Sequence, residues 1–234
     1  MFKPNEGKRL PIDVDGATYL RLPIPTGLVT EKDDIFELIE RHVKPHLQAG
    51  DVIFVSEKVL ALTQGQLIHL KDIKTTPLAR LLARNVKNHF GTEKFGGFGH
   101  GTSMAMQLII NEIGRPRVLF AAAVAAVTRP IGIHGAFYIL CGKRAKSIDC
   151  PMSFVIQPYN MYAKLPPIDP KGAARRICER FGHDTVIVDA NYRGVYSLGR
   201  SSANVAEDFV KKVFRDNPLG QSDEMTPLCI VRRG

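Results

Sequence analysis

The sequence predicts an α+β protein in which helices pack on a mixed β-sheet. Short β-branched apolar runs such as Val186–Val188 are typical of strands that are buried on both faces. Amphipathic helical segments separate these runs, but without the regular alternation of a parallel βαβ protein. No internal repeat, linker or low-complexity segment interrupts the 234 residues, so we expect one domain over residues 1–234, built either as a single large unit or as two intimate lobes.

The N-terminal part predicts two strands and a helix. Residues 1–20 are polar and favour a loop, although the alternating stretch Thr18–Ile24 predicts a strand. A helix is expected over residues 31–47, because its apolar residues have helical spacing and Thr30 has the chemistry of an N-cap. The apolar run Val52–Val55 predicts a buried strand.

The next stretch predicts one strand and two helices. The apolar residues of 59–70 indicate a strand that is interrupted around Gly65. A helix is expected over 77–90, with Thr75 as its cap and a proline in its first turn. A second helix is expected over 103–114.

A glycine-rich segment, residues 91–103, contains five glycines. It has neither the Walker pattern nor the dinucleotide-binding fingerprint. Two interpretations are open: a flexible flap, or a loop whose backbone cradles a phosphate.

The middle of the chain is less regular in pattern. Residues 118–127 are apolar throughout and predict a buried helix or a buried strand. A strand is expected over Gly132–Cys141, a basic turn over Lys143–Ser147 and a proline-rich coil over 158–170. The segment Lys171–Phe181 predicts a helix that the preceding Asp-Pro pair starts and Gly182 ends.

The C-terminal part predicts a strand, a turn, a helix and a last strand. The run ending at Val188 is the strand, and Asn191 supplies turn chemistry after it. A helix is expected between Gly199 and Asn217, with Ser202 as its cap. A short strand is expected over Pro227–Val231.

Composition favours a globular protein with an anionic partner. The formal charge is +9, which suits nucleic acid or phosphorylated ligands. The basic residues are scattered and no recognition helix or aromatic RNA-binding motif is present, so small phosphorylated molecules fit better than nucleic acid. A solvated basic surface without a ligand explains the charge equally well.

The redox state and the compartment follow from the same composition. The four cysteines, at positions 141, 150, 178 and 229, have no CxxC spacing, which favours free and mostly buried thiols. No apolar run is long enough to span a membrane, and the N-terminus lacks the apolar core of a signal peptide. We therefore expect a cytoplasmic protein without a membrane partner.

Asp189 is the first candidate site residue. It follows the buried run Val186–Val188, where a carboxylate can hold a hard divalent cation at the rim of a sheet. The alternative is that Asp189 only caps a loop.

Five stretches stand in a recognisable order along the chain: Pro23-Ile24-Pro25, residues 50–66, the segment around Asp149, residues 165–170 and the segment around Asp189. Together they resemble the family of the GTP-dependent gamma-glutamyl ligase of coenzyme F-420 biosynthesis. The family pattern GDVxVVxSKxVSKAEGR is similar to residues 50–66, and its opening PLI is similar to Pro23-Ile24-Pro25. The patterns GIDxSN and VIxSDTxGRxxRxG are similar to the segments around Asp149 and Asp189. LLPxDP is similar to residues 165–170.

The resemblance implies a fold of two intertwined lobes, a homodimer and a set of ligands and catalytic groups. Mg²⁺ or Mn²⁺ would be held by Asp149, Asp189, Asn191 and Glu224. GTP, or ATP in its place, would be bound by Pro23, Ile24, Lys58 and Gln221, and the reaction would use Lys58 and Arg193. Lysine can pair with a phosphate as a point charge, and arginine can stabilise the group in transfer. The simpler alternatives are a solvated Lys58, a turn residue at Arg193 and an exposed loop acid at Glu224.

The sequence departs from the family pattern at four positions. Met152 stands where the family has Asn, and Ala190 stands where it has Thr. Leu62 and Gln64 replace a Lys and a Glu. These departures leave two hypotheses: an amide-forming ligase with its own substrate, or a family scaffold that binds a phosphorylated or otherwise anionic small molecule without ligase chemistry.

Overall fold

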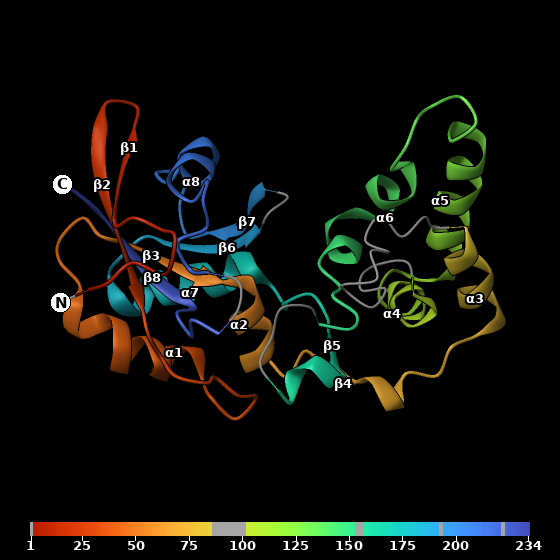
Figure 1. The fold of residues 1–234 in the computed structure, drawn as a ribbon, viewed down its shortest axis with the longest axis horizontal. Helices are drawn as coiled ribbons and strands as arrows, with labels where there is room; N and C mark the ends of the chain where they lie inside the picture. The colour runs from red at the N-terminus through yellow and green to blue at the C-terminus, as the bar shows by residue number, and fades with distance from the viewer. Residues whose placement is uncertain (1, 86–101, 153–156, 192–193, 221–222) are drawn as a thin grey trace. The chain divides into compact units, whose positions relative to one another are not determined.

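The computed structural model describes residues 2–85, 102–152, 157–191, 194–220 and 223–234. The chain forms two compact units. The first contains residues 1–65 and 167–234, and the second contains the inserted residues 66–166. The predicted α+β class is confirmed, because the described residues form a mixed six-stranded sheet together with helices (Figure 1).

The first unit is built on a sheet with the strand order β1-β2-β8-β3-β6-β7. Only β3 and β6 pair in parallel, and the other neighbours are antiparallel. The strands are β1 (Pro11–Val14), β2 (Ala17–Ile24), β3 (Val52–Ser56), β6 (Thr185–Asn191), β7 (Gly194–Arg200) and β8 (Leu228–Arg233).

The strands predicted from Thr18, Val52, Val186 and Pro227 onward are therefore confirmed, while β1 lies in the stretch expected to be a loop. The two residues between β1 and β2, Asp15 and Gly16, have φ values of 49° and 81°. These left-handed conformations are those of the tight hairpin turns that Asp-Gly pairs favour. The turn brings the short β1 against β2, and so the polar N-terminal sequence forms an edge strand.

Helices cover both faces of this sheet. On one face α8 (Glu207–Val213) packs in a core that contains Phe54, Val186 and Val188, with Phe54 stacked on Phe214 at a centroid distance of 4.3 Å. On the other face lie α1 (Ile35–Leu38), α2 (Glu57–Thr63) and α7 (Pro170–Phe181) (Figure 1). The central strands are thus buried on both faces, as the β-branched composition of Val186–Val188 predicts.

Two predicted helices start later than expected. The first begins after Asp34, whose carboxylate accepts hydrogen bonds from the amides of Phe36 and Glu37, while Thr30 is bonded to Asp33 instead. It continues as a π-helical turn over Ile39–Val43 and a 3-10 turn over Lys44–His46, because Pro45 has no N–H to continue the α-helical pattern.

The second such helix is α8, which begins at Glu207 rather than after Ser202. Ser202 is engaged elsewhere: its hydroxyl donates to Asp184 at 2.7 Å. The helix predicted at Lys171 is confirmed as α7, with Asp169 as its N-cap and Gly182 at its C-terminal end.

The strand predicted for the start of 59–70 is wrong, because residues 57–63 form α2. Four consecutive residues of α2 are buried, Val59, Leu60, Ala61 and Leu62. This turn is therefore apolar on every side and its sequence shows no helical period. Only β4 (Leu67–His69) is a strand in this stretch.

The second unit is mainly helical. Its core is formed by α3 (Pro77–Arg84), α4 (Ser103–Ile113), α5 (Arg115–Thr128) and α6 (Ala136–Lys146), and β4 pairs with β5 (Tyr162–Lys164). Thr76, rather than Thr75, caps α3, which ends at Arg84, and residues 86–90 of the predicted helix lie outside the described residues. The helix predicted over 103–114 is confirmed, while β5 and a 3-10 turn at Tyr159–Met161 lie in the expected coil.

Two predictions for this unit need correction. The apolar stretch 118–127 is helical, but of α5 only Val118 and Ala121 are buried, and Phe120 is 62% exposed. The strand expected over 132–141 and the basic turn after it are instead the helix α6, which is kinked at Gly142. Its buried residues Phe137, Cys141 and Ala145 recur every four positions, a helical period that extends beyond the predicted strand.

Among the residues that the structure describes, no helix has the length and apolar character to cross a membrane.

Candidate functional site

The candidate site lies at the edge of the six-stranded sheet where β2, β3 and β6 end. The register places Ile24 of β2 opposite Leu228, Leu228 opposite Val55, and Ser56 beside Val188. Because β8 is antiparallel to its neighbours, this edge also receives the segment that precedes β8. The tertiary structure thus brings Pro23, Ile24, Lys58, Asp189, Asn191 and Glu224 to one edge of one sheet.

Asp189 and Asn191 are two positions apart on β6 and therefore share one face of the strand. Both side chains are half-buried, and the Asn191 amide donates to the Asp189 carboxylate at 3.1 Å. A carboxylate and an amide oxygen on one face are the hard donors that magnesium and manganese take. These two residues therefore fit such an ion, with oxygens from the substrate or water completing its coordination.

Ala190 lies on the opposite face of β6 from Asp189. It packs, together with Val188, against the core that α8 covers. Its identity therefore affects packing on that face and adds no ligand beside Asp189.

Lys58 lies in the first turn of α2, immediately after β3. Its neighbour Glu57 is buried, with 5% of its surface exposed. A buried acid is rare unless it has a partner, so Glu57 is a candidate site residue that the sequence analysis missed. A signal was present, since Glu57 follows a buried strand as Asp189 does, but an acid in the first turn of a helix also has the simpler dipole explanation.

Glu224 lies in the segment between α8 and β8. Its half-buried carboxylate folds over Gly220, where a Cβ atom would lie 2.2–2.6 Å from the carboxyl group. The amide of Thr26, just after β2, donates to the carbonyl of Met225 at 3.0 Å. The backbone beside Glu224 is thus hydrogen-bonded to the end of β2.

A pocket of about 520 Å³ opens near the end of β2. It is lined by Phe2, Lys3, Pro4, Asn5, Pro23, Pro25, His46 and Thr226. Its rings, Phe2 and His46, meet edge to face with centroids 5.0 Å apart. Pro23 therefore lines a cavity, whereas Ile24 is a core residue that is 2% exposed and can reach a ligand only through its backbone.

Asp149 belongs to the second unit, whereas Asp189 belongs to the first. Asp149 and Lys164 exchange two backbone hydrogen bonds, of 3.0 and 2.8 Å, so their side chains leave the same face of this short ladder. Lys164 is almost fully buried, and its ammonium group donates to the carbonyl of Ser147 at 2.7 Å. A metal site shared by Asp149 and Asp189 stays a prediction.

Three of the predicted features lie outside the described residues: Arg193, Gln221 and residues 91–101 of the glycine-rich segment. Within the described ranges, no group of three or more His, Cys, Asp or Glu side chains is arranged to hold a metal ion.

The other departures from the family pattern have structural roles in this chain. Leu62 and Met152 are buried, with 6% and 3% of their surfaces exposed. The side-chain amide of Gln64 accepts from the backbone N–H of Ile168 at 2.6 Å and donates to its carbonyl at 3.0 Å. Gln64 therefore joins the two segments where the chain leaves and re-enters the first unit.

The fold and the candidate site define an α+β protein in which acidic, amide and cationic side chains gather at the edge of a mixed sheet. The family model of the F420-0:gamma-glutamyl ligase matches residues 23–193, which is most of the chain. The chain therefore belongs to the F420-0:gamma-glutamyl ligase family. No individual curated protein matches the sequence.

Proposed function

We propose that this protein is a metal- and nucleotide-dependent ligase that forms an amide bond between a carboxylate substrate and an amino acid. The observation that carries the proposal is that Lys58, Asp189 and the segment of Glu224 lie at the same edge of one sheet in a chain of this family. Glutamate, the amino acid that the family name implies, is the first candidate for the amine.

The proposed reaction has two steps. A carboxylate oxygen of the substrate attacks the γ-phosphorus of GTP or ATP, and the nucleoside diphosphate leaves. The amine nitrogen then attacks the carbonyl carbon of the acyl phosphate, inorganic phosphate leaves, and the amine loses a proton. In both steps negative charge develops on the oxygens of a leaving phosphate group. Cations must neutralise this charge.

The residues supply this chemistry as follows. Asp189 and Asn191 would hold Mg²⁺ or Mn²⁺, with Asp149 and Glu224 as further proposed ligands. The bound ion would neutralise phosphate oxygens. Lys58 would pair with a phosphate, and Arg193 and Gln221 remain proposed from the family resemblance.

The position of the pocket near Pro23 favours an elongated ligand such as a nucleotide. Strand β2 is three strand spacings from β6, roughly 14 Å. A nucleotide with its base or sugar in the pocket at the end of β2 would therefore extend its phosphates along the sheet edge toward Asp189. The Phe2 and His46 rings in this pocket suit a base, and Lys3 suits an anionic group.

Calorimetry of nucleotide binding tests the proposal. GTP or ATP should bind in the presence of Mn²⁺ or Mg²⁺ and bind weakly in EDTA. Asp189→Asn should lower nucleotide affinity under conditions in which the variant is fully folded. Asp13→Asn, which removes an exposed charge from strand β1, should not. A wild-type protein that binds neither nucleotide at millimolar metal contradicts the proposal.

A second function, binding of an anionic small molecule without ligase chemistry, is favoured by the apolar, buried side chains of Leu62 and Met152. It predicts that Asp189→Asn leaves ligand binding nearly unchanged. A large loss of affinity together with loss of bound Mn²⁺ would contradict it.

We also propose a homodimer, on the basis of family membership. Light scattering should then give twice the chain mass of 25.9 kDa. A mass equal to that of one chain at micromolar concentration would contradict this assembly.

A further inference from the structure

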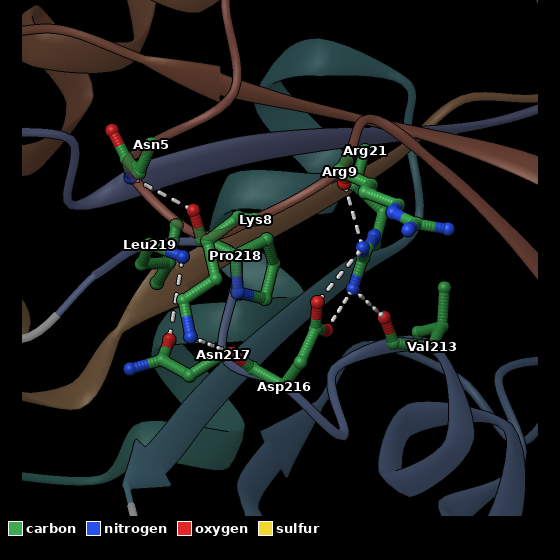
Figure 2. Close-up of polar contacts among 9 residues, drawn as sticks. All are labelled: Asn5, Lys8, Arg9, Arg21, Val213, Asp216, Asn217, Pro218 and Leu219. Atoms are coloured by element: carbon green, nitrogen blue, oxygen red, sulfur yellow. Dashed lines mark hydrogen bonds and ion pairs between the residues drawn. The ribbon is translucent and has the colours of Figure 1, made fainter.

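The segment between α8 and β8 is held by residues from the far N-terminal end of the chain. Figure 2 shows Asn5 reaching the carbonyl of Pro218, while Arg21 and Lys8 contact Asp216 at the start of the same segment. These contacts join residues about 200 positions apart in sequence, so no local pattern specifies them.

Asn5 and Thr226 join the two ends of this segment to each other. The Asn5 amide donates to the Pro218 carbonyl at 2.8 Å and to the Thr226 hydroxyl at 2.8 Å. The Thr226 hydroxyl in turn donates to the Leu219 carbonyl at 2.8 Å. Thr226 is 8% exposed, so its hydroxyl has little access to replacement partners in water.

Glu224 lies between these two tied ends. Only Met225 separates it from Thr226, and its carboxylate rests over Gly220, next to Leu219. Because Thr226 is hydrogen-bonded to Asn5 and to Leu219, the described backbone beside Glu224 loses conformational freedom before any ligand arrives.

We propose that Asn5 and Thr226 are positioning residues, which clamp the base of the segment that carries Glu224 and thereby hold its carboxylate in place for a metal–nucleotide complex. This inference rests on the proposed function for the identity of the ligand. Both residues also line the pocket near the end of β2, but neither touches the reacting atoms. Hydrogen exchange without ligand separates an effect through the segment of Glu224 from a direct contact with the nucleotide.

Loss of this clamp should change the fraction of molecules in which the segment has the conformation that binds the ligand. When the clamp is lost, the segment samples other conformations, and the apparent dissociation constant rises by the inverse of the competent fraction. Loss of both hydrogen bonds of one hydroxyl should lower that fraction about tenfold.

A pair of threonine variants tests this mechanism. Thr226→Val removes the hydroxyl while it keeps the shape, and Thr226→Ser keeps the hydroxyl. Thr185→Val is the matched control, because Thr185 is also a buried threonine of the first unit that donates to a backbone carbonyl, that of His183 at 3.1 Å. Thr185 starts β6 and therefore lies at the opposite edge of the sheet.

The first readout is the affinity for Mn²⁺–GTP. Thr226→Val should raise the dissociation constant about tenfold, Thr226→Ser should restore it, and Thr185→Val should leave it unchanged although its melting temperature falls comparably. Equal affinities of Thr226→Val and Thr185→Val would overturn the inference.

The second readout is hydrogen exchange of peptides that cover Leu219 and Asp223–Thr226, which needs no ligand. Faster exchange confined to these peptides in Thr226→Val supports the clamp, and exchange equal to that of Thr185→Val overturns it. If the wild-type protein binds no nucleotide, the proposed function fails while the exchange result still decides whether the clamp exists.

Discussion

Arg21 and Asp216, 195 residues apart in sequence, form an ion pair in which both Asp216 oxygens accept from the Arg21 guanidinium group (Figure 2). Arg21 is 1% exposed, and it also donates to the carbonyls of Arg9 at 2.6 Å and Val213 at 3.2 Å. The pair therefore joins β2, the N-terminal segment and the end of α8. Within the described residues, the Arg21 Nε atom has no hydrogen-bond partner, so the pairing of the other nitrogens is essential to its burial.

The first prediction concerns the pH dependence of this pair. Burial by itself raises the pKa of Asp216, but the hydrogen bonds and charge of Arg21 outweigh it and hold that pKa below its ordinary value. The stabilisation is therefore fully present above the unfolded-state pKa of about 3.9 and is lost as the pH falls through the lower folded-state pKa.

Asp216→Asn should reduce the free energy of unfolding by on the order of 1–3 kcal/mol at neutral pH, because it leaves a buried guanidinium group without its anion. Urea denaturation of the wild-type protein and the variant should show that the difference between their free energies of unfolding stays constant down to about pH 4 and decreases below it. The control Asp15→Asn alters an exposed pair with Lys212 and should change little. A gap that stays constant through the acid range would contradict the prediction.

The second prediction concerns Gly199 in β7. A Cβ atom there would lie 2.3 Å from the Pro170 carbonyl oxygen and 2.6 Å from the Lys171 nitrogen, at the start of α7. Gly199→Ala should therefore destabilise the protein by about 1–3 kcal/mol, because two backbones must separate. Thermal denaturation measures the loss.

Gly16→Ala provides the comparison for Gly199. Its Cβ meets no atom within 4 Å, and its cost comes only from the φ of +81°, about 1–2 kcal/mol. Enlarging the side chain to Val should increase the loss at Gly199 much more than at Gly16. Equal responses at the two sites would show that the packing of α7 on β7 imposes no requirement for glycine.

The third prediction concerns Gly220 and Glu224. A Cβ atom at Gly220 would overlap the Glu224 carboxyl group, so Gly220→Ala must displace that side chain. Gly182→Ala is a matched control, because its φ of +74° is close to the +77° of Gly220 and its Cβ meets no atom within 4 Å.

Both variants should lose similar stability from backbone strain, about 1–2 kcal/mol. Only Gly220→Ala should also lower the affinity for Mn²⁺ in the presence of nucleotide, measured by titration of the paramagnetic ion. Unchanged Mn²⁺ affinity in Gly220→Ala would contradict a role of Glu224 as a ligand.

The fourth prediction concerns the thiols, which are all free cysteines in the structure. Burial raises the pKa of Cys141 to about 11 and that of Cys150 to about 12, and it also raises the pKa of the fully buried Cys229. Because the thiolate is the reactive form, these three cysteines should react with a disulfide reagent only on unfolding.

Cys178 is half-buried on α7 and should give the fast phase at neutral pH. A Cys178→Ser variant should therefore show no fast phase in the native protein and three thiols in denaturant. Rapid modification of a second thiol in the native variant would show that one of the buried cysteines is accessible.

The sequence determined the elements whose signals are local. The strands at Thr18–Ile24, Val52–Val55 and Val186–Val188 follow from β-branched or alternating runs, and α7 follows from Asp169, Pro170 and Gly182. The family, with Asp189 as a candidate ligand, also followed from motifs in order along the chain.

The tertiary structure decided what local patterns leave ambiguous. Residues 59–62 of α2 are apolar and buried on every side of the helix, so the sequence there has no period that distinguishes a helix from a strand. The register of β2, β8, β3 and β6 brings the candidate site residues to one edge and separates Ala190 from Asp189 by the thickness of a strand. Asn5 and Arg21 acquire their roles from partners about 200 residues away, and such contacts exist only once the chain has folded.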